Sequence, residues 1–191
     1  MSEQDSDISG HQPNPRDDFT IRPLSVTDVD QYWPLRLRAL YEEPEAFGSS
    51  YEEQCGRAME DVAARLAEMT SGDGFVLGAF VGEELKGIVS LGRETYRKGR
   101  HKAGVYQVYV APEVRGRGYG RRLMEDLLLR ARQIMGLEQL LLAVNAANVP
   151  ARTLYVALGF ESYGLERRAL KLPDGTALDE ELMVYWLADR P

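Results

Sequence analysis

The chain has 191 residues, 44% of them hydrophobic, and a formal net charge of −7 at pH 7. This composition is typical of a folded globular protein and excludes disordered and fibrous classes, and the length is sufficient for one domain with a substantial core. The acidic charge argues against a general nucleic-acid partner, because such proteins usually present a basic surface.

Cysteine and histidine are too scarce for several kinds of site. Cys55 is the single cysteine, which excludes an intramolecular disulfide, and only two histidines are present, so we expect no metal site of the Cys/His kind and no metal. No apolar run approaches the roughly 18 residues that a membrane-spanning helix needs, so no membrane partner is expected. The first residues lack the basic start and apolar stretch of a secretory signal, which makes a cytoplasmic location the default expectation.

The N-terminal half of the chain is predicted to contain helices and hairpin strands. Residues 1–17 are polar and are expected to form a flexible tail, whereas residues 18–191 are expected to form a single domain. The predicted elements are, in chain order, a strand (19–22), a helix (27–43), a second helix (61–69) and two strands of a hairpin (75–81 and 85–92). The apolar face of the first helix is predicted to consist of Trp33, Leu37, Leu40 and Tyr41.

The C-terminal half is predicted to contain strand–helix–strand units. Its elements are a strand (103–110), a helix (119–135), a strand (137–144), a helix (148–158) and two closing strands (160–172 and 178–187). The run 137–144 is almost continuously apolar, as expected of a strand covered on both faces. Together these patterns predict one α/β (α+β) domain with a mixed, mostly antiparallel sheet flanked by helices.

The segment that precedes the helix 119–135 combines glycine with positive charge. Its sequence is VRGRGYGRR, residues 114–122. The N-terminus of a helix presents N–H groups without internal partners and a partial positive charge, which attract anions. Glycines allow a ligand to approach the main chain closely, and the arginines add full charges. The segment therefore predicts an anion site suited to a diphosphate.

Two well-known phosphate-binding loops do not match this segment. A Walker A loop requires Gly-Lys-Ser/Thr, and no lysine is present here. The dinucleotide fingerprint is G-x-G-x-x-G, whereas the spacing here is G-x-G-x-G. The spacing alone leaves a simpler interpretation open, namely a glycine-rich turn followed by solvent-exposed arginines.

Three segments together resemble the GNAT family, the Gcn5-related N-acetyltransferases. RGRGYG (115–120) matches the R-x-x-G-x-G loop of the family, and LLAVNAANVPARTLYVALGFESYG (141–164) is similar to the next block, with its Asn, Tyr and Leu-Gly-Phe. LRLRALYEEPEAFGSSYEE (35–53) resembles the first helices of many members. The resemblance covers about residues 19–187 and implies the GNAT acyl-CoA N-acyltransferase fold.

The resemblance also implies where acetyl-CoA, the co-substrate, would bind. In the family the loop amides hold the pyrophosphate of CoA, and the free main chain of the preceding strand pairs with the pantetheine amides. A main-chain N–H of this strand, here that of Val108, is the usual oxyanion donor. The implied cofactor-binding residues are Val108, Val110, Arg115, Gly116, Arg117, Gly118, Tyr119, Gly120, Arg121 and Asn148.

Tyr155 matches the family residue that acts as general acid toward the CoA sulfur, so it is the predicted catalytic residue. Asn148, Arg152 and Tyr155 are spaced i, i+4 and i+7 and should share one face of a helix. The alternative is a tyrosine that simply packs in the core above the Leu-Gly-Phe turn. The general base stays open among Glu43, Glu94, His101, Tyr106 and Gln107.

The expected activity is transfer of an acetyl group from CoA to a primary amine by direct attack in a ternary complex. The acceptor is a small-molecule or peptide amine, and carboxylates in segments 32–51 and 172–181 suggest a cationic one, although loops also carry charge for solubility. The alternative function is a non-enzymatic acyl-CoA-binding sensor or regulatory protein on the same fold. Family members are often dimers, which leaves a homodimer open.

Overall fold

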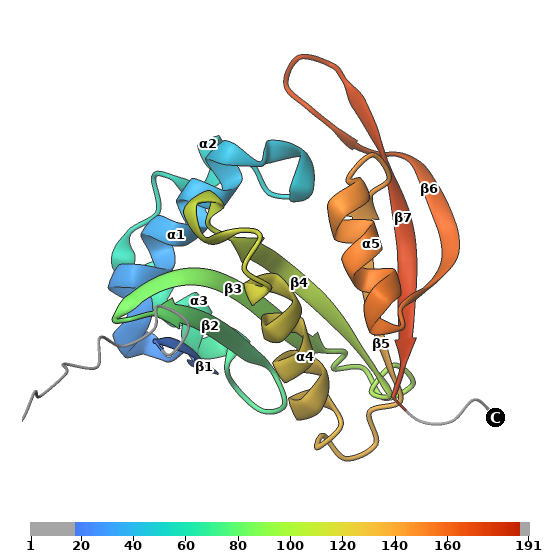
Figure 1. The fold of residues 1–191 in the computed structure, drawn as a ribbon, viewed down its shortest axis with the longest axis horizontal. Helices are drawn as coiled ribbons and strands as arrows, with labels where there is room; N and C mark the ends of the chain where they lie inside the picture. The colour runs from blue at the N-terminus through green and yellow to red at the C-terminus, as the bar shows by residue number, and fades with distance from the viewer. Residues whose placement is uncertain (1–17, 188–191) are drawn as a thin grey trace, which may run out of the picture.

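The computed structural model describes residues 18–187, so the tail predicted for residues 1–17 lies outside the described part of the chain. Within that part, seven strands form one sheet in the order β1-β2-β3-β4-β5-β7-β6 (Figure 1). All neighbouring strands are antiparallel except β4 and β5, which are parallel, and this confirms the mixed, mostly antiparallel sheet. The strands are β1 (Phe19–Pro23), β2 (Phe75–Val81), β3 (Glu84–Arg93), β4 (Lys102–Val110), β5 (Gln139–Asn145), β6 (Glu161–Lys171) and β7 (Ala177–Trp186).

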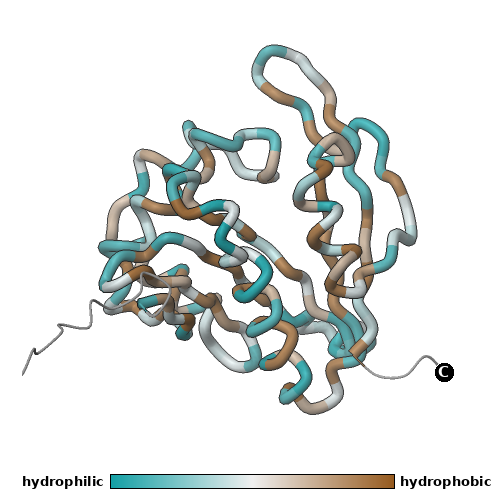
Figure 2. The backbone as a smooth tube through the Cα atoms, viewed as in Figure 1, coloured by the Kyte–Doolittle hydropathy of each residue, from teal (hydrophilic) through white to brown (hydrophobic). Residues whose placement is uncertain are grey.

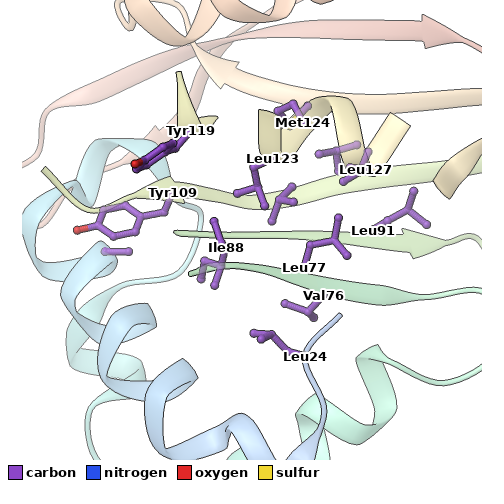
Figure 3. Packing of buried hydrophobic residues seen from close by; sticks show 14 of the residues in the cluster. Leu24, Val76, Leu77, Ile88, Leu91, Tyr109, Tyr119, Leu123, Met124 and Leu127 are labelled. Carbon is purple, nitrogen blue, oxygen red and sulfur yellow. The ribbon is translucent and has the colours of Figure 1, made fainter. Parts of the chain in front are cut away.

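Helices cover both faces of the sheet. In Figure 3, α4 lies on one face of the central strands, and α1 and α3 lie on the other. Helix α5 packs beside α4, in front of β5 and β7 in Figure 1. The helices are α1 (Val29–Glu42), α2 (Tyr51–Gln54), α3 (Met59–Met69), α4 (Tyr119–Ala131) and α5 (Val149–Leu158). None of them is long and apolar enough to cross a membrane, as far as residues 18–187 are concerned.

The core lies between α4 and the central strands. Leu123, Met124 and Leu127 of α4 have no exposed surface and pack above Ile88 and Leu91 (Figure 3). Burial of each such side chain contributes about 1.5–3 kcal/mol to stability. Figure 2 shows the same division, with hydrophobic colour along the central strands and hydrophilic colour in the connecting loops.

Two helix predictions differ from the structure. Tyr41 is 72% exposed rather than buried, because α1 turns its apolar stripe toward the sheet through Trp33 and Leu40. Helix α4 ends at Ala131 rather than near 135, because the main-chain N–H groups of Gln133 and Ile134 bond three residues back and tighten the chain into turns. Helix α2 lies in a stretch where no helix was predicted; the other helices and strands are of the predicted types, with boundaries that shift by one or two residues.

Candidate active site

The loop before α4 has a main chain suited to a close ligand. Gly116 and Gly118 have φ of 75° and 81°, in the left-handed region that residues with side chains rarely adopt. A Cβ atom at either position would meet no protein atom within 4 Å, so the loop borders open space. Gly118 is the N-cap of α4, and no side chain caps this end. The first N–H groups of α4 therefore keep their capacity to bind an anion.

Arg115 is folded back onto the protein. Its Nε donates to the Val110 carbonyl oxygen at 2.8 Å, and its Nη1 donates to Glu43 Oε1 at 2.8 Å. The guanidinium therefore fixes the loop to the end of β4 and to the end of α1. Its charge is partly neutralised by Glu43, so its attraction for a ligand is weaker than the sequence suggested.

The other residues of the loop differ in how they can reach a ligand. Tyr119 is buried and stacks on Phe19 with ring centroids 4.0 Å apart, so only its main chain faces the loop. Arg122 lies 4.2 Å over the same Phe19 ring, and Arg121 donates to a carbonyl oxygen of α5 at 3.4 Å. Arg117 is exposed and has no ion pair among the described residues.

Strands β4 and β5 share only their first residues and then diverge (Figure 1). Residues 102–104 pair with residues 139–141, and the parallel ladder ends there. Further along β4, Gln107 has φ of 59°, and the register with β3 passes from Tyr106 directly to Tyr109. A bulge of this kind leaves main-chain groups outside the ladder. The bulged residues Gln107 and Val108 line a cavity in the gap between the strands.

Two cavities occupy this gap. The main cavity, about 600 Å³, is lined by the middle of β4, by β5 and by Tyr155 of α5. The second cavity, about 470 Å³, extends along the end of β4 past Val110 and Arg115, the last residue before the glycine loop. Val108 and Asn148 line both cavities. The two therefore adjoin and lead from the loop toward Tyr155.

Tyr155 reaches the main cavity from α5. Its side chain is 6% exposed and packs against Phe160, with ring centroids 5.8 Å apart. No side chain or main-chain group among residues 18–187 forms a hydrogen bond with its hydroxyl. Burial raises the pKa of Tyr155 above the usual value of tyrosine, so the hydroxyl keeps its proton at neutral pH. The side chain thus both packs in the core and presents a hydrogen-bond donor to the cavity.

The three polar residues predicted to share one face of α5 take separate roles. Asn148 caps the helix, with its Oδ1 accepting from the Ala151 N–H at 3.1 Å. Arg152 forms an ion pair with Glu181 of β7, which attaches α5 to the sheet. Of these three residues, only Asn148 and Tyr155 line the main cavity.

The residues left open as general base are not equally placed. Glu43 is engaged by the loop arginine, and neither Glu94 nor His101 lines one of the cavities described in residues 18–187. Tyr106 lines the main cavity. Its pKa is raised mainly by burial and, to a smaller extent, by the negative charge of Glu94. Gln107 also lines the cavity, but an amide side chain cannot take up a proton.

Glu180 is a carboxylate of the site that the sequence did not distinguish from its acidic neighbours. In the sequence it was only one of the carboxylates of segment 172–181, yet it alone among the Asp and Glu residues of 18–187 lines the main cavity. Burial raises its pKa, and the charge of Glu166 on β6 adds to the shift. Most of the other carboxylates of the two segments are engaged by arginines, a tyrosine or main-chain N–H groups, namely Glu42, Glu43, Asp174, Asp179 and Glu181.

Two arginines of the main cavity, Arg36 of α1 and Arg65 of α3, were missed by sequence reasoning. A signal for Arg36 was present, because it lies three residues after Trp33 and four before Leu40, inside the apolar stripe of α1. A charged residue in such a stripe faces the interior of the protein when the stripe packs against the sheet. No group of His, Cys, Asp and Glu side chains within residues 18–187 could hold a metal ion.

Comparison with known proteins agrees with the geometry. The model of the acetyltransferase (GNAT) family matches residues 37–160. The chain belongs to the GNAT family. N-alpha-acetyltransferase RimI from Mycobacterium tuberculosis is 34% identical over 118 residues, which are 60% of this chain and 70% of RimI. The resemblance found in the sequence is thereby confirmed, as is the assignment of the chain as an N-acetyltransferase.

Solved structures of GNAT proteins share the fold. A GNAT acetyltransferase from Streptococcus pneumoniae has a TM-score of 0.81 at 22% identity, covering 88% of this chain and 99% of that one. Ribosomal-protein-alanine N-acetyltransferase from Brucella melitensis has a TM-score of 0.76 at 23% identity, covering 87% and 99%. A phosphinothricin acetyltransferase from Sinorhizobium meliloti, in complex with AcCoA, has a TM-score of 0.77 at 21% identity and covers 90% of each chain.

Proposed function

We propose that this GNAT protein transfers the acetyl group of acetyl-CoA to a primary amine, with the amine attacking directly in a ternary complex. The observation that carries the proposal is the arrangement of three features along one gap. These are an uncapped helix N-terminus with an open glycine loop, a main chain freed by the divergence of β4 from β5, and the hydroxyl of a largely buried tyrosine, which has no hydrogen-bond partner among residues 18–187 and faces the cavity.

The loop and the start of α4 would hold the diphosphate of CoA. The main-chain N–H groups from Gly116 to Arg121 are the donors, and Arg117 has a guanidinium free to add charge. Each helix-end interaction contributes about 0.3–1 kcal/mol, and up to ~2 kcal/mol when it is partly buried. Several such contacts would give a diphosphate a gain of several kcal/mol.

The gap between β4 and β5 would hold the pantetheine arm. Val108 and Val110 border the second cavity, and their main chain is the proposed partner of the arm. Asn148, the N-cap of α5, lines the same cavity. The Val110 carbonyl already accepts a hydrogen bond from Arg115, so a pantetheine amide would have to share or replace that donor.

Acetyl-CoA, when bound, supplies the thioester that is broken in the reaction. The N–H of Val108 is the proposed donor to the oxygen on which negative charge develops, since it lies at the bulge and lines both cavities. The Tyr155 hydroxyl donates a hydrogen bond to the sulfur as charge builds there. Because its pKa is raised, Tyr155 stays protonated and can donate over the whole neutral range.

Glu180 is the proposed acceptor of the proton that the ammonium group must lose. A raised pKa brings a carboxylate closer to the pH at which general bases are most effective. Tyr106 also lines the cavity, but its raised pKa leaves it protonated and unable to act as a base at neutral pH.

The proposal is tested by CoA release measured with a thiol reagent across a panel of primary amines, with products identified by mass spectrometry. We expect amine-dependent CoA release and an N-acetylated product. If acetyl-CoA bound tightly but no amine increased CoA release, the proposal of acetyl transfer to an amine would be wrong.

A further inference from the structure

Arg36 carries a buried donor that nothing in the protein satisfies. Its Nη1 is the one buried side-chain nitrogen or oxygen in residues 18–187 that lacks a hydrogen-bond partner. Buried polar groups are almost always paired, and an exception calls for an explanation such as a ligand. Arg36 lines the main cavity, where a ligand could supply the missing acceptor.

The surroundings of Arg36 fix its guanidinium without using this donor. The group lies 4.5 Å from the centroid of the Phe47 ring, which occupies one of its faces. The nearby Tyr32 hydroxyl donates its proton to Gln107 Oε1 at 2.9 Å. Stacking on Phe47 therefore explains the position of the plane of the guanidinium, but it leaves the N–H groups at its edge available.

The contrast with Arg38, two residues further along α1, shows that the missing partner is specific to Arg36. Arg38 donates to Glu42 at 2.8 Å and to both carboxylate oxygens of Glu113 at 2.9 Å. Arg36 has no ion pair with any described carboxylate. An uncompensated buried charge is strongly destabilising, so a site that keeps one is suited to an anionic ligand.

Further positive charge surrounds Arg36. Arg65 lines the main cavity beside it, and the pKa of Arg36 is lowered mainly by burial and, to a smaller extent, by the charge of Arg65. Arg57 joins both arginines in the wall of a small adjoining cavity, and no acidic residue lines that cavity within the described chain. Because like charges repel, an anion placed between the three guanidinium groups would stabilise all of them.

The cavity places this cationic cluster and the reaction centre in one space. Arg36 comes from α1 and Tyr155 from α5, which lie on either side of β4 (Figure 1), and both line the main cavity. Its volume of about 600 Å³ is typical of sites for small molecules. A Cβ atom added to Gly48, which follows α1, would lie 3.9 Å from the side chain of Leu170 on β6. The close approach of these two segments restricts the space over the cavity.

We propose that the acceptor is a small amine that also carries a carboxylate, and that Arg36 and Arg65 bind this carboxylate while the amine lies near Tyr155 and Glu180. The inference rests on the proposed function and names its substrate class. It replaces the cationic acceptor suggested by the acidic loops, because most of those carboxylates are engaged elsewhere.

The test compares amines in matched pairs that differ only in the anionic group. Glycine and glycinamide, L-leucine and L-leucinamide, and 4-aminobutanoate and its amide are assayed by CoA release, alongside a peptide with a free N-terminus. We expect at least one acid to be preferred over its amide by about 10- to 100-fold in kcat/KM, the range for a hydrogen bond to a charged group. The preference should fall close to unity in Arg36→Gln and should decrease in Arg65→Gln.

Controls separate this inference from the proposed function. Arg97→Gln, in the exposed turn between β3 and β4, should keep the wild-type preference, and Arg36→Gln should keep its acetyl-CoA affinity in calorimetry. Arg65 is exposed on α3, so Arg65→Gln is expected to fold even if Arg36→Gln does not. Equal use of acid and amide, a preference unchanged in the variants, or acetylation of the peptide alone would overturn the inference. If acetyl-CoA itself did not bind, the proposed function would fail, and calorimetric titration with the acids would still decide whether the arginines bind a carboxylate.

Discussion

Replacement of Tyr155 by phenylalanine isolates the role of one hydroxyl. The ring is 6% exposed, and phenylalanine fills the same volume, so no cavity is created. The hydroxyl has no partner within residues 18–187, so its loss should change the free energy of unfolding by less than about 1 kcal/mol. Loss of an acid–base group lowers turnover by about 10²–10⁴-fold. This corresponds to roughly 2.7–5.4 kcal/mol in the activation free energy, at 1.36 kcal/mol for each factor of ten.

The assay measures kcat from CoA release at saturating acetyl-CoA and amine, and the affinity for acetyl-CoA by calorimetry. We expect kcat to fall by the factor above while the Kd of acetyl-CoA changes by less than about threefold, since the hydroxyl acts on charge that appears only during the reaction. Tyr163→Phe, on a tyrosine of β6 that is 56% exposed, is the matched control and should behave as the wild type. A Tyr155→Phe enzyme that turned over within a few-fold of the wild-type rate would refute the role of this hydroxyl.

Three further predictions address the loop, the core and the base. Gly118→Ala and Gly72→Ala both place a side chain at positive φ (81° and 59°) and should each cost about 1–2 kcal/mol of stability in urea denaturation, but only Gly118→Ala should raise the Kd of acetyl-CoA, by tenfold or more in calorimetry. Equal affinities in the two variants would contradict the loop assignment. Leu127→Ala should lower the free energy of unfolding by about 2–5 kcal/mol, whereas Leu129→Ala, at a residue 58% exposed, should change it by less than about 0.5 kcal/mol. Glu180→Gln should reduce kcat/KM more at pH 7 than at pH 9, because a free amine needs no base at high pH. Because the pKa of Glu180 is raised, the activity of the wild type should begin to fall, as the pH is lowered, at a higher pH than an ordinary glutamate would give. If Glu180→Gln reduced kcat/KM by the same factor at pH 7 and at pH 9, the role of Glu180 as a base would be contradicted.

The cationic cluster changes how the acidic character of the chain is interpreted. The formal net charge is −7, and the acidic loops suggested a site for cations. In the folded protein the main cavity is lined by Arg36 and Arg65 and by a single described carboxylate, Glu180. Net charge therefore says little about the charge that a substrate meets inside a site.

The sequence was sufficient to predict the glycine loop and the elements on either side of it. The positive φ values of Gly116 and Gly118 and the start of α4 at Tyr119 depend on local main-chain preferences, which are encoded in a few neighbouring residues. The same is true of α5, which Asn148 caps and Gly159 ends with φ of 98°. Local signals of this kind do not depend on the rest of the fold.

Only the tertiary structure decided which side chains meet in the cavity. The bulge at Gln107, the folding of Arg115 onto Glu43 and the isolation of Arg36 all depend on contacts between elements far apart in the chain. Glu180 became distinct from its acidic neighbours because β7 lies next to β5 and turns this one carboxylate inward. A sequence pattern can show that a residue is charged, but whether its charge is paired, exposed or left to a ligand depends on packing between distant segments.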